Sequence, residues 1–239
     1  MSQKVKLLGV KIDNVNFNQA LDRCLGFLCS NKQNFVVTPN PEIILLANKD
    51  DQYRKILNSA DLAVPDGIGL KIASGFKIKN RVTGTDLLFS LLKIAEQRKL
   101  RVYGIIYKDG LSTKDEIKSA IYKKFPKLSF ELRYSGEGKV EQMIDQFRPD
   151  LVFVALGAPD QEKWIAHHIR KFGYVKMYAG IGGGFDFLAE TQKRAPAWVR
   201  KTGFEWLWRL IRHPNRIGRI FNAVVVFPVK VLFSSSRER

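Results

Sequence analysis

The strongest constraint on this fold is the position of its turn-forming residues. Five short apolar runs each end in a turn rich in Gly, Pro or Asp, and a segment with the pattern of a helix follows each turn. Strands that alternate with helices form a parallel sheet covered on both faces. The sequence therefore predicts an α/β fold with a mostly parallel, Rossmann-like sheet. The five runs are residues 34–37, 61–64, 101–106, 151–156 and 175–181.

The same pattern predicts where a ligand would bind. In an open parallel sheet, every strand-to-helix turn emerges at the carboxyl edge, and ligands bind in a crevice there. Turns that are far apart in the chain should therefore meet at one edge. This geometry favours an enzyme that acts on a small molecule. The turns are residues 38–41, 65–69, 107–110, 157–161 and 182–186.

The strand–helix alternation stops near residue 195. A chain of 239 residues can form one α/β domain and a modest appendage. We therefore expect a catalytic α/β domain at 1–195 and a helical C-terminal appendage at 196–239, which would bind the membrane and complete the active site. Apolar residues at 217, 220, 221, 224 and 225 have the spacing of an amphipathic helix.

The positive charge is concentrated in this appendage. The net charge is +17, and residues 193–239 contain eleven Lys or Arg against two acidic residues. Such a surplus indicates an anionic partner, which could be the phosphates of a ligand, anionic lipid or nucleic acid. On one continuous helix, four arginines would form a basic stripe, although Pro214 makes that continuity doubtful. They are Arg209, Arg212, Arg216 and Arg219.

Three interpretations of the appendage remain open. Trp198, Trp206 and Trp208 beside arginines match an anchor at an anionic membrane surface, which we favour. An amphipathic helix packed on the domain with solvated arginines is the second. Nucleic-acid binding is the least favoured, because no helix-turn-helix or RNA-binding signature is present. The longest apolar stretch, residues 223–233, is interrupted by Pro228 and Lys230 and is shorter than the roughly 20 residues that span a bilayer.

Asp66 is the strongest candidate for a catalytic residue. It follows a predicted strand, and Gly67 and Gly69 beside it would let a ligand approach the backbone. A carboxylate there is ionised at neutral pH and could accept a proton from an attacking hydroxyl group. Asp66 would also serve well as the N-cap of the next helix. The residue pattern alone does not decide between these two roles.

The first turn and the segment after residue 80 offer further binding groups. Thr38 and Asn40 could contact sugar hydroxyls or a nucleotide, although Asn40 taken alone is more typical of a helix cap. Thr85 has the pattern of a cap at the start of a helix. The amides of that helix and the guanidinium group of Arg81 could hold an anion.

The last two turns add an amide and a glycine loop. Gln161 opens a helix, so its side chain is expected to face the crevice. Residues Gly182, Gly183 and Gly184 form the loop best suited to phosphate, because no side chain shields their amides. The loop matches neither a Walker A nor a G-x-G-x-x-G pattern, which argues against a dinucleotide-dependent dehydrogenase.

The sequence also lacks familiar metal-binding patterns. It contains no Asp-x-Asp pair, and its three histidines lack the spacing of metal ligands. We therefore expect no metal or other cofactor. If a diphosphate leaves during the reaction, backbone amides and Arg or Lys would have to stabilise its charge.

Taken together, these motifs resemble those of the WecG/TagA/CpsF glycosyltransferase family. The resemblance covers nearly the whole chain in the expected order. It is carried by residues 38–42, 60–69, 81–87, 155–164, 182–187, 193–196 and 203–210.

The resemblance implies an inverting enzyme on the inner face of the cytoplasmic membrane that needs no metal ion. Such enzymes transfer a sugar from a UDP-sugar to a polyprenyl-diphosphate-linked acceptor in teichoic acid or related surface polysaccharide synthesis. By motif position, Asp66 would be the base, with Thr38 beside it. Asn40, Arg81 and Gln161 would also line the site.

The substrates and the main alternatives also come from this resemblance. Teichoic acid members move N-acetylmannosamine onto lipid-linked N-acetylglucosamine, and other members use UDP-N-acetylmannosaminuronic acid or UDP-glucose as donor. The rival from a different class is a basic scaffold that binds membranes or nucleic acid. The sequence leaves the formation of a homo-oligomer open.

Overall fold

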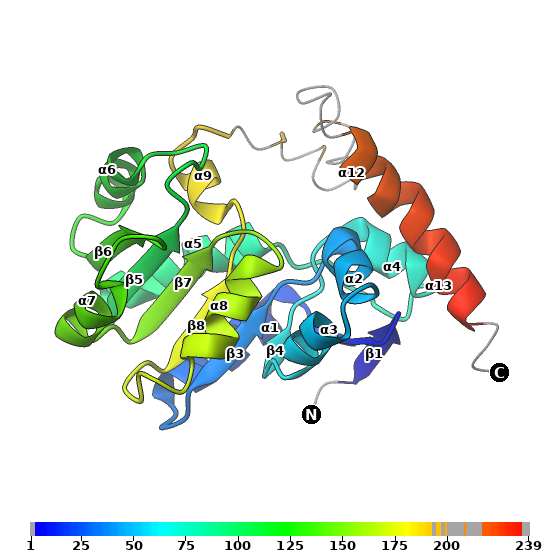
Figure 1. Ribbon diagram of the computed structural model, residues 1–239, viewed down its shortest axis with the longest axis horizontal. Helices are drawn as coiled ribbons and strands as arrows, with labels where there is room; N and C mark the ends of the chain where they lie inside the picture. Colours follow the sequence, from blue (N-terminus) through cyan, green and yellow to red (C-terminus); the bar gives the residue numbers. More distant parts are fainter. Residues whose placement is uncertain (1–2, 193–194, 197–198, 200–207, 209–216, 236–239) are drawn as a thin grey trace.

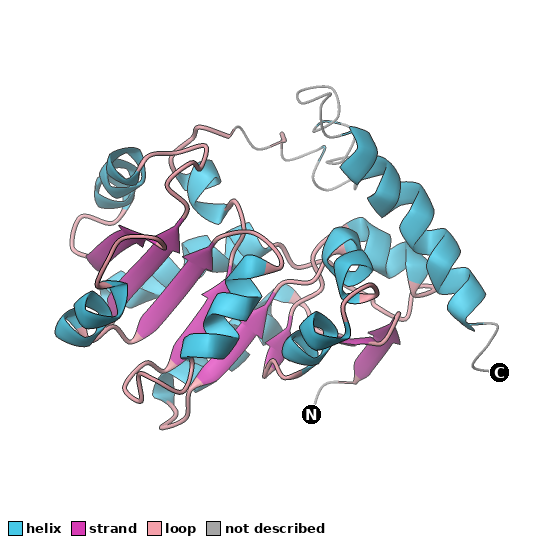
Figure 2. Ribbon diagram, viewed as in Figure 1, coloured by secondary structure: helices cyan, strands magenta, loops and turns pink. Residues whose placement is uncertain are grey.

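A six-stranded parallel sheet forms the centre of the protein (Figures 1 and 2). The computed structural model describes residues 3–192, 195–196, 199, 208 and 217–235. The strand order is β4-β3-β8-β7-β5-β6, and every pairing is parallel. This confirms the predicted fold class. The strands are β3 (Asn34–Val37), β4 (Leu62–Ala63), β5 (Arg101–Ile106), β6 (Ser129–Tyr134), β7 (Leu151–Ala155) and β8 (Met177–Gly180).

Helices cover both faces of the sheet, and each face has its own hydrophobic core. Successive strand side chains point to opposite faces, so Phe35 and Val37 lie in one core and Val36 lies in the other. The first core contains residues of α2 (Pro41–Ala47), α3 (Asp51–Asn58), α7 (Val140–Phe147) and α8 (Asp160–His168). The second contains residues of α1 (Phe17–Cys29), α5 (Gly84–Gln97), α6 (Lys114–Lys124) and α9 (Gly184–Leu188).

The connections leave the centre of the sheet in opposite directions. Strands β5 and β7 are neighbours, yet α6, which follows β5, packs on one face and α8, which follows β7, packs on the other. In a doubly wound sheet, such a point opens a crevice outside the carboxyl ends of the two strands. The topology therefore places a ligand site at that edge.

The N-terminal segment differs from its predicted form. The apolar pattern of residues 5–10 predicts a single strand, but β1 (Lys4–Leu7) and β2 (Val10–Asp13) form an antiparallel hairpin. Leu8 and Gly9 form its tight turn with φ angles of 46° and 84°. A leucine at the first turn position is not the usual hairpin signal, which explains the error. The hairpin supports β4, because Asp13 Oδ2 accepts a hydrogen bond of 2.9 Å from the amide of Ala63.

The C-terminal segment forms one continuous helix that packs against α2 and α4 (Ile68–Ala73) (Figure 1). It comprises α12 (Ile217–Phe221), the π-helical η2 (Asn222–Val226) and α13 (Phe227–Ser235). The helix continues through Pro228, one of the two residues that interrupt the apolar stretch 223–233. The π-helical turn before the proline, in which the amide of Phe227 bonds to the carbonyl of Asn222, accommodates the proline ring and its missing N–H.

Much of the predicted appendage lies outside the described residues. These include Arg209, Arg212 and Arg216 of the predicted basic stripe, and the side chain of Arg219. Among the described residues, no helix combines the length and the apolar character that crossing a membrane requires.

Candidate active site

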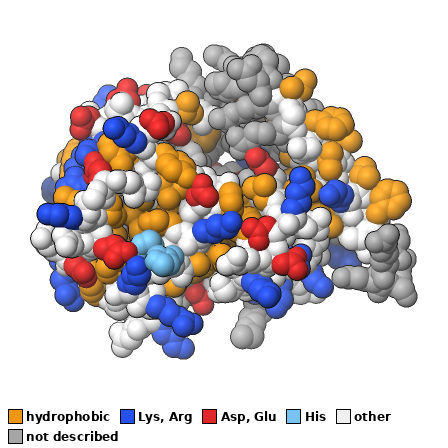
Figure 3. All heavy atoms as spheres, viewed as in Figure 1, with side chains coloured by type: hydrophobic (Ala, Val, Ile, Leu, Met, Phe, Trp, Pro, Cys, Tyr) orange, Lys and Arg blue, Asp and Glu red, His pale blue; other side chains and the backbone are white. Residues whose placement is uncertain are grey.

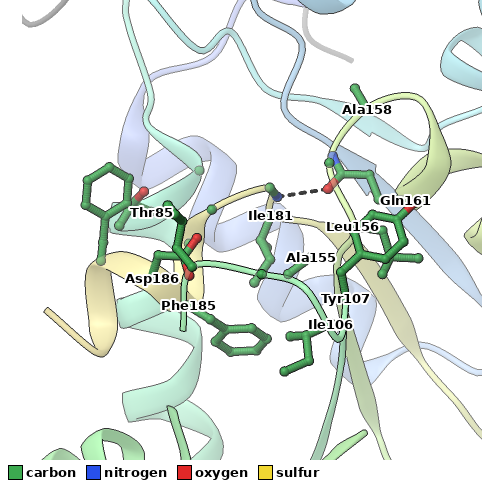
Figure 4. Close-up of a pocket in the computed structure, with 18 of the residues that line it drawn as sticks. Thr85, Ile106, Tyr107, Ala155, Leu156, Ala158, Gln161, Ile181, Phe185 and Asp186 are labelled. Carbon is green, nitrogen blue, oxygen red and sulfur yellow. Dashed lines mark hydrogen bonds between the residues drawn. The ribbon is translucent and has the colours of Figure 1, made fainter. Parts of the chain in front are cut away.

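A pocket of about 440 Å³ opens at the carboxyl edge of the sheet (Figure 4). Residues from the turns after β3, β4, β5, β7 and β8 line it, together with the first residues of α5. The structure therefore confirms the prediction that turns far apart in the sequence meet at one edge of the sheet. Eight predicted site residues line the pocket: Thr38, Asn40, Asp66, Thr85, Gln161, Gly182, Gly183 and Gly184.

Asp66 lines the pocket without capping the helix that follows it. The N-cap of α4 is Gly67, at φ 100°, and α4 has no side-chain cap hydrogen bond. A residue with a side chain would be strained at that φ angle, so glycine allows the sharp turn after Asp66. The backbone amide of Asp66 donates a hydrogen bond of 3.0 Å to the carbonyl of Pro39. The helix-cap interpretation of Asp66 is therefore wrong, and a role in the pocket remains.

Thr38 and Asn40 reach the same pocket from the end of β3. Thr38 is buried, and its hydroxyl donates a hydrogen bond of 3.4 Å to the carbonyl of Gly180. Asn40 caps α2, because its Oδ1 atom accepts a hydrogen bond of 3.0 Å from the amide of Ile43. The cap interpretation of Asn40 is thus confirmed. Asn40 also lines the pocket.

The start of α5 forms another wall of the pocket. Its cap is Thr83, whose Oγ1 accepts from the amide of Asp86 at 3.2 Å, so the predicted cap at Thr85 is wrong. Thr85 instead lies in the first helical turn, where unpaired amides favour an anion. The helix also packs closely on β3, since a Cβ atom on Gly84 would lie 3.1 Å from Cγ2 of Thr38.

Arg81 is not among the residues that line the pocket. Its segment nevertheless lies next to the Asp66 turn. The amide of Val82 donates a hydrogen bond of 2.9 Å to the carbonyl of Pro65. A direct part for Arg81 in ligand binding remains a prediction.

Gln161 holds the glycine loop in place. Its side chain is 2% exposed. Its Oε1 atom accepts a hydrogen bond of 2.9 Å from the amide of Gly182, which has a φ angle of 49° (Figure 4). The Nε2 group donates to Oε1 of Glu162 at 2.6 Å. Gln161 therefore faces the pocket edge as predicted, and its amide group is engaged with the loop.

Tyr107 and Asp186 are among the polar pocket residues that were not singled out from the sequence. Tyr107 follows β5 and donates a hydrogen bond from its hydroxyl to Asp160, which raises the pKa of the tyrosine. Asp186 lies in the first turn of α9 and accepts a hydrogen bond of 2.8 Å from the hydroxyl of Ser112. In Figure 4, Asp186 and Thr85 lie on one side of the pocket, and Tyr107 and Gln161 lie on the other. Both missed residues belong to turns that the sequence had identified.

The described part of the pocket is rich in acidic groups and amides. Among its described lining residues, Glu42, Asp66, Asp109 and Asp186 are acidic, and none is Lys or Arg. Within the same part of the chain, no group of three or more His, Cys, Asp or Glu residues could hold a metal ion. The pocket can therefore offer a carboxylate as a proton acceptor and backbone amides as donors to an anion.

The chain matches a family model and curated relatives over nearly its whole length. The model described as "Glycosyl transferase WecG/TagA/CpsF family" covers residues 5–239. A protein of Staphylococcus aureus (strain MRSA252) is 32% identical over 238 residues, which cover 95% of this chain and 92% of that protein. A protein of strain MW2 is 32% identical over 241 residues, with the same coverage.

Both relatives bear the name N-acetylglucosaminyldiphosphoundecaprenol N-acetyl-beta-D-mannosaminyltransferase. The motifs that suggested the resemblance are thus supported by agreement along the entire sequence. The chain belongs to the WecG/TagA/CpsF family and is a glycosyltransferase.

Proposed function

We propose that this protein transfers N-acetylmannosamine from UDP to a polyprenyl-diphosphate-linked N-acetylglucosamine in the synthesis of teichoic acid or a related surface polysaccharide. The names of the relatives support the sugar and the acceptor. The observation that carries the mechanism is the position of Asp66. This residue lines the pocket, and it is not the N-cap of α4. The division into a catalytic domain at 1–195 and an appendage at 196–239 belongs to the same proposal.

The reaction is a single displacement that inverts the anomeric carbon. An acceptor hydroxyl forms the new bond to that carbon while Asp66 takes the hydroxyl proton. The bond between the carbon and the β-phosphate oxygen breaks, and UDP leaves with the electron pair. Residues 182–184 and the first residues of α5 line the pocket. The amides of Gly182 and Gly184 donate to Gln161 and to the carbonyl of Ile181, so the amide of Gly183 and those at the start of α5 would stabilise the departing diphosphate.

The leaving group also needs positive charge. None of the described lining residues is Lys or Arg, whereas residues 193–239 contain eleven. We propose that basic residues of the appendage, including Arg209, Arg212, Arg216 and Arg219, complete the site, with Arg81 beside it. Electrostatic stabilisation of this kind replaces a divalent metal ion in the proposed mechanism.

A membrane surface is the proposed location of the reaction, on the inner face of the cell membrane. The exposed side of α12–α13 is largely apolar, and Leu232 and Phe233 are 67% and 73% exposed (Figure 3). Ile72 and Phe76, in and just after the neighbouring α4, are also exposed. Exposed apolar residues concentrated on neighbouring helices, in a chain of net charge +17, suit an anionic lipid surface. The lipid-linked acceptor would be presented there.

A donor panel tests this function. Purified protein is incubated with an analogue of polyprenyl-diphosphate N-acetylglucosamine and one of several UDP-sugars, and the release of UDP is followed. We expect release with UDP-N-acetylmannosamine, dependent on the acceptor and retained in EDTA. Preference for UDP-N-acetylmannosaminuronic acid or UDP-glucose would reassign the donor. Salt-sensitive DNA or RNA binding without UDP binding would favour the basic scaffold instead.

A further inference from the structure

A buried carboxyl group lies directly behind the glycine loop. Glu162 of α8 is 0% exposed and does not line the pocket. Its hydrogen-bond partners among the described residues are Tyr53 and Gln161, which carry no charge at neutral pH. Burial raises the pKa of this carboxyl to about 7. Buried carboxyl groups usually have a cationic partner, so this arrangement needs an explanation.

Glu162 is part of a chain of hydrogen bonds that ends at the loop. The hydroxyl of Tyr53 donates to Oε2 of Glu162 at 2.9 Å, and Nε2 of Gln161 donates to Oε1 of Glu162 at 2.6 Å. The amide of Gly182 then donates to Oε1 of Gln161 at 2.9 Å. The chain joins α3, α8 and the turn after β8.

This chain of hydrogen bonds determines which way the side-chain amide of Gln161 points. The N–H group of Gly182 needs an oxygen, so the oxygen of Gln161 must face it and the NH₂ group must face away. That NH₂ group is buried and requires an acceptor, which Glu162 provides. Without this acceptor, the Gln161 side chain would lose the contact that fixes its terminal rotation.

The side chains of Gln161 and Glu162 pack closely against the backbone of Gly180. A Cβ atom on Gly180 would lie 3.0 Å from Nε2 of Gln161 and 3.2 Å from Oε1 of Glu162. The two side chains therefore lie directly against the backbone at the end of β8. Gly180 makes room for them just before the glycine loop begins.

We propose that Glu162 is a positioning residue that, supported by Tyr53, orients Gln161 and thereby fixes the glycine loop that receives the donor diphosphate. This inference deepens the proposed function and rests on it for the identity of the ligand. Glu162 does not touch the substrate. It acts through the Gln161–Gly182 hydrogen bond.

The position of Glu162 also gives donor binding a pH dependence. When Glu162 ionises, a negative charge appears behind a loop that binds an anion, so affinity for the diphosphate falls as pH rises through about 7. The neighbouring ionisable groups are Tyr53 on α3 and Asp160 on α8. Further out, Asp50 and Lys163 form an exposed ion pair between the same helices, 3.3 Å apart.

The test compares two substitutions at position 162. Glu162→Gln keeps an acceptor for Gln161 and replaces the acceptor of the Tyr53 hydroxyl by an NH₂ donor, from which that hydroxyl can accept, whereas Glu162→Leu removes both contacts. Calorimetry measures the Kd of UDP-N-acetylmannosamine without acceptor near pH 6 and pH 8. Unlike free UDP, this ligand has no terminal phosphate monoester that titrates near neutral pH. The backbone amide resonance of Gly182 reports on the loop without any ligand.

For Glu162→Leu, we expect a Kd about tenfold weaker, as for the loss of one buried hydrogen bond, and a shifted Gly182 amide resonance. Glu162→Gln should restore the resonance and bind the donor with little pH dependence. Tyr53→Phe should change the donor Kd and the Gly182 resonance less than Glu162→Leu does. The matched control is Tyr178→Phe, since Tyr178 lies in the same core without a hydrogen-bond partner for its hydroxyl among the described residues.

Two results would overturn the proposal. One is a Glu162→Leu protein with an unchanged Gly182 resonance and wild-type Kd. The other is a Glu162→Gln protein whose pH dependence equals that of the wild type, and this comparison decides the matter if Glu162→Leu does not fold. Failure of the wild type to bind the donor would contradict the proposed function instead. In that case, the Gly182 resonance still tests the positioning role.

Discussion

The backbone amide of Asp66 donates a hydrogen bond of 3.0 Å to the carbonyl oxygen of Pro39. This bond joins the turn after β4 to the turn after β3, so two segments that are distant in sequence are held together at the pocket. Thr38 and Asn40, on either side of Pro39, line the same pocket as Asp66. A main-chain contact thus helps to set the position of the proposed base. Changing its side chain should therefore leave the local backbone intact.

The close approach of α5 to β3 predicts a sensitive glycine. In Gly84→Ala, the new Cβ would lie 3.1 Å from Cγ2 of Thr38, so Thr38 or the helix start must shift. We expect a loss of stability of about 1–3 kcal/mol, typical of overpacking, and a kcat/KM reduced about tenfold. Thermal unfolding and transfer kinetics measure both effects.

Gly26→Ala is the matched control. Gly26 lies inside α1, and a Cβ there would meet nothing within 4 Å. It should gain up to about 1 kcal/mol of stability from helix propensity, with unchanged kinetics. Wild-type kinetics in Gly84→Ala would show that the α5 start does not shape the pocket.

The buried carboxyl of Glu162 predicts how stability changes with pH. Its pKa is raised from 4.5 to about 7 in the folded protein. The neutral form of Glu162 therefore contributes its full share of the folding stability below about pH 4.5. This contribution is lost as pH rises through about 7. The loss should be on the order of a few kcal/mol. Urea unfolding at several pH values measures it.

Glu162→Gln serves as the comparison for that titration. It removes the ionising group while keeping the shape of the side chain, so its free energy of unfolding should fall less between pH 5 and pH 8 than that of the wild type. Parallel pH profiles for the two proteins would mean that Glu162 does not titrate in this range.

The apolar side of α12–α13 predicts membrane binding that can be separated from folding. Leu232 and Phe233 are exposed, so Leu232→Ser with Phe233→Ser should leave the melting temperature unchanged and weaken binding to anionic vesicles. Phe227→Ala is the contrasting variant, because Phe227 is buried. It should cost about 3–5 kcal/mol in the packing of this helix. Vesicle sedimentation of the double variant at wild-type levels would contradict the proposed surface.

Removal of residues 196–239 tests whether the appendage completes the site. The truncated protein should lose transfer, because the proposed cationic groups are gone. It should also lose stability, because Phe227 and Val231 belong to the hydrophobic core, so circular dichroism must show that the protein compared is folded. A truncated protein that is fully active, or that still sediments with anionic vesicles, would rule out the role proposed for this segment.

The central architecture could be predicted because it depends on local pattern. Apolar runs that end in Gly, Pro or Asp turns indicate strands, and the rules of parallel sheets then bring the turns to one edge. This reasoning predicts that Asp66, Gln161 and the glycine loop lie at that edge, and they line the pocket there. Asn40 was also interpreted correctly as a cap, because its side chain acts on a residue three positions away.

The errors and omissions involve contacts or backbone forms that local pattern does not encode. Glu162 lies in the first turn of an amphipathic helix, where an acidic residue usually faces water, and its partner Tyr53 is 109 residues away. The helix through Pro228 depends on a π-helical turn that sequence periodicity does not reveal. The Leu8–Gly9 hairpin turn was likewise hidden, because its first residue is not a typical turn former.

The most direct test is the turnover of Asp66→Asn. Asparagine has nearly the same shape but cannot act as the base, and α4 does not use this side chain as a cap. We predict an unchanged melting temperature, unchanged UDP affinity and a kcat lowered by about 10²–10⁴-fold. Asp61→Asn, at the other end of the same strand segment, should retain activity, because its side chain accepts a hydrogen bond from the amide of Phe35 and is not among the described residues that line the pocket. Wild-type turnover in Asp66→Asn would contradict the account.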